Sequence, residues 1–83
     1  MTLLARVQAC WGDAVGPGLS AAARPVGERE GVVTVACESA VWAQELELLG
    51  SDLLARLNER LGPLGEGLVT RLRFVVGSPA NHL

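Results

Sequence analysis

The stretch that decides the fold is residues 30–46, which read EGVVTVACESAVWAQEL. The Glu-Gly pair that opens it is typical of a tight turn between two strands. Residues 32–38 then alternate in polarity, with Val33 and Val35 on one face, as in a half-buried strand. Ser39 has the residue type that caps a helix N-terminus, and helical apolar spacing follows it. A strand is therefore predicted to lead directly into a helix.

This predicted helix covers about residues 39–61 and ends at Gly62-Pro63. Its apolar residues recur every three or four positions and form one continuous stripe. Gly50 interrupts the helix, and because glycine costs about 1 kcal/mol relative to alanine there, we expect a kink or a split. Together with residues of the flanking elements, the stripe supplies the expected core anchors, which are Trp11, Trp42, Leu46, Leu49, Leu53, Leu57 and Phe74.

Three further elements flank this region. A helix is predicted over residues 2–15, a weak strand over 24–29 and a last strand over 68–76. The order α-β-β-α-β predicts an α+β fold with a three-stranded sheet that has both helices on one face. We expect one domain over residues 1–77, followed by a mobile tail over residues 78–83.

The strand over residues 24–29 contains Pro25, which cannot donate to a strand ladder, so it is predicted at an edge of the sheet. Open edges accept strands from other chains. This edge is therefore a candidate contact for a homodimer or for another protein partner.

Composition excludes most catalytic classes. The chain of 83 residues has one histidine, His82, which falls in the expected tail and is a poor candidate for a positioned base. It has no lysine, so a phosphate-binding P-loop is excluded. Cys10 and Cys37 with a single histidine are too few for a zinc site. We expect no catalytic residue, no metal and no cofactor, and therefore no enzyme.

Charge and hydropathy place the chain in a broad class. Its net charge is −2 and its pI is about 5.2, so bulk charge gives no reason to expect nucleic-acid binding. No apolar run approaches the roughly 18 residues that a membrane helix needs, and no signal-peptide pattern opens the chain. We expect a cytoplasmic protein without a membrane partner.

The arginines of the second half are the candidate contact residues. Arg71 and Arg73 alternate with Phe74 in the last predicted strand, so they should point away from the helices, toward water or a partner. Arg56 and Arg60 lie four residues apart on the long helix, away from its leucine stripe. They either form a solvated helix face or extend an anion-binding patch that includes Arg71 and Arg73.

An ordered set of residues resembles one bacterial family. The set is Trp11-Gly12-x-x-Val15-Gly16, Arg24-Pro25, residues 30–35, residues 39–46, Leu53-Leu54-x-x-Leu57-Asn58 and Leu72-Arg73-Phe74-x-Val76-Gly77. In these residues the chain resembles the DciA family, whose members help the replicative DNA helicase. The resemblance implies a K-homology-like fold, binding to a DnaB-type helicase and support of helicase loading in DNA replication.

Two other functions stay open beside this one. K-homology domains that bind nucleic acid clamp its backbone with a Gly-x-x-Gly loop. The corresponding segment here is Gly50-Ser51-Asp52-Leu53, which lacks the second glycine and carries an acid. Direct binding of single-stranded DNA is therefore expected to be weak. The second alternative is a protein-interaction or oligomerisation domain unrelated to replication.

Overall fold

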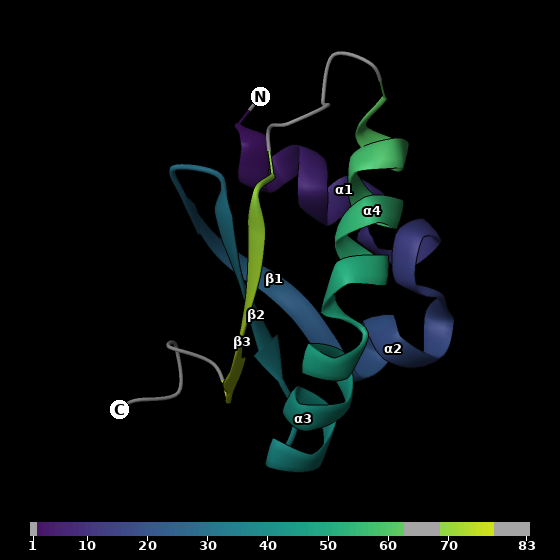
Figure 1. Cartoon of the computed structure of the whole chain (residues 1–83), viewed down its shortest axis with the longest axis vertical. Helices are drawn as coiled ribbons and strands as arrows, with labels where there is room; N and C mark the ends of the chain where they lie inside the picture. The colour runs from purple at the N-terminus through teal and green to yellow at the C-terminus, as the bar shows by residue number, and fades with distance from the viewer. Residues whose placement is uncertain (1, 63–68, 78–83) are drawn as a thin grey trace.

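The computed structural model describes residues 2–62 and 69–77; the predicted tail, 78–83, lies outside them. The predicted α+β class is confirmed. Figure 1 shows the helices gathered on one side of a three-stranded sheet. In chain order the elements are α1 (Leu3–Val15), α2 (Pro17–Ala22), β1 (Ala23–Arg29), β2 (Val32–Cys37), α3 (Ala40–Leu48), α4 (Gly50–Leu61) and β3 (Arg71–Val76).

β2 is the central strand of the sheet. It pairs antiparallel with β1 and parallel with β3, so the order is β1-β2-β3. The predicted Glu30-Gly31 turn joins β1 to β2, with φ of 51° and 85° at its two residues. Positive φ at both central residues is the geometry of a type I′ hairpin. The turn is secured by the Gly31 N–H, which donates to the Glu28 carboxylate at 2.9 Å.

The long helix predicted over residues 39–61 is split at Leu49. Ser39 caps α3 by accepting from the Trp42 N–H at 3.3 Å, and α4 begins at Gly50. Leu49 itself has φ −97° and ψ 4°, which takes it out of both helices. Its prediction as a core anchor is wrong, because the change of direction there leaves it 43% exposed.

The last strand is shorter than predicted, beginning at Arg71 instead of residue 68, which lies outside the described residues. β2 begins at Val32, whose partner is Arg71, so the residues before Arg71 precede the paired strand. The alternation of β3 does not continue into this segment: Val69 is 2% exposed and joins the core, whereas Thr70 is exposed. The Asn58 side-chain amide donates to the Val69 carbonyl at 2.9 Å and so holds this segment against α4.

The core lies between the sheet and the helices. Of the predicted anchors, Trp11 is 3% exposed, and its indole N–H donates to the Ala23 carbonyl at 2.9 Å. Trp42 and Phe74 pack against the core but are only partly buried. The remaining predicted anchors, Leu46, Leu53 and Leu57, are at most 1% exposed. Each such leucine contributes about 1.5–3 kcal/mol through burial.

No helix in the described part of the chain is both long enough and apolar enough to cross a membrane.

Candidate functional site on the sheet face opposite the helices

Strand register decides which side chains share the face opposite the helices. Paired residues on neighbouring strands point to the same side of a sheet. Val33 and Val35 of β2 are fully buried under the helices, so the residues that alternate with them point to the other side. Across the sheet these residues form three rows, Arg29–Val32–Arg71, Gly27–Thr34–Arg73 and Arg24–Ala36–Val75.

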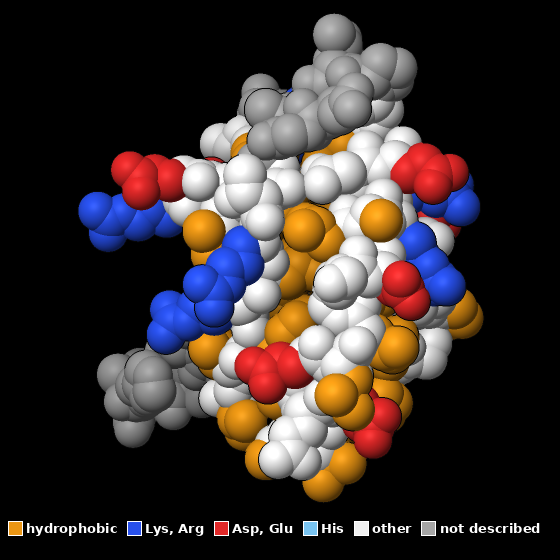
Figure 2. All heavy atoms as spheres, viewed as in Figure 1, with side chains coloured by type: hydrophobic (Ala, Val, Ile, Leu, Met, Phe, Trp, Pro, Cys, Tyr) orange, Lys and Arg blue, Asp and Glu red, His pale blue; other side chains and the backbone are white. Residues whose placement is uncertain are grey.

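This face carries four of the seven arginines of the chain, and all four are exposed. We call Arg24, Arg29, Arg71 and Arg73, with the small residues between them, the arginine face. Figure 2 shows basic side chains projecting from the sheet side of the molecule, away from the helices. An acidic group also lies beside the uppermost basic side chain on the sheet side, and on the helical side basic and acidic side chains lie next to one another.

The arginine face has two rails and a floor. Arg24 and Arg29 form one rail on β1, and Arg71 and Arg73 form the other on β3. The rails are roughly 10 Å apart, because each step between strands is about 4.8 Å. The floor between them follows β2 and consists of small, uncharged side chains, Val32, Thr34 and Ala36.

A bulge in β1 brings its two arginines to the same face. Arg24 and Arg29 are five positions apart, so simple alternation would place them on opposite faces. The register shifts between Pro25 and Gly27, and Val26 has no partner on β2. This extra residue restores the alignment. Sequence analysis did not select these two arginines; the Pro-Val-Gly stretch was the available signal, because glycine inside a strand often marks a bulge.

Arg71 and Arg73 point away from the helices as predicted, whereas Leu72 between them and Phe74 after them pack against the core. Arg71 lies at the outer edge of the sheet. There it borders a hollow of about 240 Å³ that it shares with Glu47 and the start of α4.

Arg56 and Arg60 do not extend the arginine face. They line a separate hollow of about 270 Å³ between α1 and α4, together with Asp13 and Glu59. Both acids lie beside the two arginines there, so this part of the helical layer has mixed charge. The alternative of a solvated helix face fits this placement better than an extended basic patch.

β1 is at the edge of the sheet as predicted, but its first half is not open. The Trp11 indole donates to the Ala23 carbonyl at 2.9 Å, and the Gln8 amide donates to the Pro25 carbonyl at 3.1 Å. Pro25 also has no N–H to offer. An incoming strand would find these groups already occupied, which weakens the case for a dimer built by strand addition.

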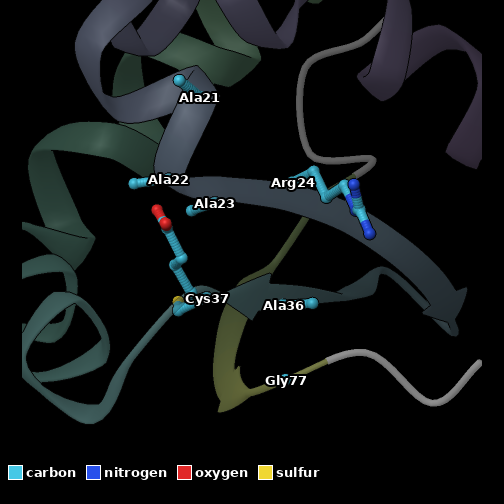
Figure 3. A pocket seen from close by; sticks show the side chains of 8 residues that line it. Ala21, Ala22, Ala23, Arg24, Ala36, Cys37 and Gly77 are labelled. Carbon is cyan, nitrogen blue, oxygen red and sulfur yellow. The ribbon is translucent and has the colours of Figure 1, made fainter. Parts of the chain in front are cut away.

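A hollow of about 250 Å³ lies at the end of the sheet where β1 begins. Three alanines, Ala21, Ala22 and Ala23, form one side of it, and Arg24 extends away from them along β1 (Figure 3). Arg24, Cys37 and Glu38 also line the hollow, so among the described residues its only charged side chains are one arginine and one glutamate.

The two cysteines are not activated thiols. Burial raises the pKa of the Cys37 thiol above its ordinary 9.0, and the Glu47 carboxylate raises it further. Burial likewise raises the pKa of Cys10, and Asp13 adds to this effect. A nucleophilic cysteine needs the opposite shift. Within residues 2–62 and 69–77, no cluster of three His, Cys, Asp or Glu is arranged to hold a metal ion.

A second exposed feature lies on α3. Val41 is 68% exposed and Leu48 is 83% exposed, and Leu49 follows at the junction with α4. Glu45 and Glu47 lie on the same helix, so this apolar surface has acidic neighbours, in contrast to the arginine face.

Comparison with known proteins identifies the family. The sequence model of the family described as "Dna[CI] antecedent, DciA" matches residues 2–74. The chain belongs to the DciA family. It is 45% identical over 75 residues to a UPF0232 protein of Streptomyces avermitilis, covering 87% of this chain and 40% of that protein. A UPF0232 protein of Rhodococcus jostii is 36% identical over 64 residues, covering 77% of this chain and 32% of that protein.

A UPF0232 protein of Mycolicibacterium smegmatis is 38% identical over 65 residues, covering 78% of this chain and 32% of that protein. The chain thus spans about a third of the length of these relatives. The family match covers every described element except the end of β3. The resemblance found in the sequence is therefore confirmed at the level of the family.

Proposed function

We propose that this DciA-family chain is a non-enzymatic binding module that associates with a DnaB-type replicative helicase and assists its loading or operation on DNA. The observation that carries the proposal is the family match over residues 2–74. The character of the described surface supports it, because exposed charged and apolar surfaces are typical of a module that acts by contact. The raised pKa values of both thiols also fit a non-catalytic role.

The arginine face and the exposed residues of α3 are the two surfaces through which such a contact could be made. Arg71 and Arg73 remain our first choice for the charged part of it. Arg29 lies across β2 from Arg71, and Arg24 lies two rows further along β1. Charged residues at an interface mainly accelerate association, so their contribution should decrease as salt screens it.

The test is a binding titration of the chain against the purified replicative helicase of its host. We expect saturable binding, weakened by Arg71→Glu with Arg73→Glu and preserved in the matched control Arg56→Glu with Arg60→Glu. Binding to a different protein recovered from the host, with no affinity for the helicase, would favour an interaction domain unrelated to replication.

A further inference from the structure

From the arginine face we infer a docking site for an acidic α-helix of a partner protein, which lies along β2 between the two rails. This inference concerns the chemistry and shape of the bound segment. It does not depend on the proposed identity of the partner as a helicase.

The width of the face fits a helix. The rails are roughly 10 Å apart, and an α-helix with its side chains is about 10–12 Å across. The floor of Val32, Thr34 and Ala36 has no bulky side chain to hold a helix away from the sheet. A helix placed there would complete a second layer, which is how sheets normally cover a face.

The charges call for carboxylates on both flanks of that helix. Successive arginines on β3 are about 6.6 Å apart along the strand, close to the roughly 5–6 Å between side chains four residues apart on a helix. Arginine binds carboxylates through paired hydrogen bonds, which suits this arrangement. Acidic residues of this chain lie at the two ends of the face, Glu30 in the turn and Glu38 after β2, and not within its three rows.

Other occupants fit less well. An extended peptide on a sheet face would leave its backbone N–H and C=O groups without partners, whereas a helix bonds its own. Single-stranded nucleic acid is usually held by aromatic side chains beneath the bases, and the three rows contain none. A second copy of the chain placed face to face would set four arginines against four arginines.

The experiment uses the whole chain labelled with ¹⁵N and a synthetic alanine-rich helical peptide of roughly 20 residues, long enough to be helical. The peptide carries glutamates on both flanks of an alanine stripe, and a matched peptide has glutamines in their place. Amide shifts locate the site, and fluorescence anisotropy at two salt concentrations gives the affinity. An oligothymidylate is titrated in parallel.

We expect salt-sensitive binding of the glutamate peptide, with amide shifts along β1, β2 and β3. Reversing either rail, by Arg71→Glu with Arg73→Glu or by Arg24→Glu with Arg29→Glu, should weaken binding by about tenfold or more. Arg56→Glu with Arg60→Glu applies the same change in charge on the helical layer, and this variant should bind within about twofold of the native chain. Circular dichroism establishes that each variant is folded.

Three results would overturn the inference. They are equal binding of the two peptides, an equal loss in the Arg56 and Arg60 variant, and preference for the oligothymidylate through the same arginines. The last result would assign the face to nucleic acid instead. Failure of the helicase titration with retained peptide binding would refute the proposed function alone, so the two proposals are separable.

Discussion

The two faces of the sheet are built from the same three strands but differ in burial and in charge. On the covered face, β2 places Val33 and Val35 against the helices at 0% exposure. On the other face, the same strand places Val32 between Arg29 and Arg71, and Thr34 beside Arg73. A shift of one residue in the register of β1 would exchange these roles in that strand. The covered face should therefore control stability, and the arginine face should control binding.

Placing a charge on the covered face should have the largest effect. Val35→Arg puts a guanidinium group where the native side chain is 0% exposed under the helices. An unpaired charge in that layer costs several kcal/mol, which is comparable with the whole stability of a small domain. We expect no folded population by circular dichroism. Thr34→Arg adds the same charge on the arginine face, and it should change stability by about 1 kcal/mol or less.

Truncating a tryptophan tests the covered face next. Trp11→Ala should destabilise the fold by about 3–5 kcal/mol, because it removes a buried ring and leaves the Ala23 carbonyl without its donor. Trp42→Ala should cost less, since that ring is only partly buried. Urea unfolding of the two variants checks the order. A larger loss at Trp42 would contradict the placement of the core under α1.

Reversing the charge of the arginine face should leave the fold nearly unchanged. Arg71→Glu with Arg73→Glu should shift the free energy of unfolding by about 1 kcal/mol or less, because exposed charges contribute little to stability. A thermal melt measures this beside the binding titration. If this double variant unfolds, the arginines stabilise the sheet itself. The assignment of stability to the covered face and of binding to the arginine face is then wrong.

High pH should have the smallest effect on stability. This effect comes from the two thiols that pack on the covered side of the sheet. Burial raises the pKa of both thiols, so the unfolded state loses their protons at lower pH than the native state does. Stability should therefore fall as pH rises above about 9. The chain has no lysine and no tyrosine to titrate in the same range. Unfolding measured from pH 7 to pH 10.5 should show a loss that Cys37→Ala reduces.

Local patterns were enough to predict much of the fold. Features that depend only on neighbouring residues can be predicted from the sequence. They include the turn at Glu30-Gly31, the strand after it and the Ser39 cap. The direction of Arg71 and Arg73 followed from alternation with Phe74. The break near Gly50 was predicted, but the exposure of Leu49 was not. A change of helix direction alters the surroundings of the residues at the junction, and helical spacing alone does not predict that change.

By itself, the sequence determined the α+β class, the order of the three strands and of the two main helical segments, the two arginines of β3 and membership of the DciA family. The separate short helix α2 was not predicted. Tertiary structure alone decided the pairing of β3 with β2, the placement of Arg56 and Arg60 beside Asp13, and the second arginine rail. That rail depends on a bulge, and a bulge is defined by the register between two strands. Because register is a relation between segments, no single stretch of sequence contains it.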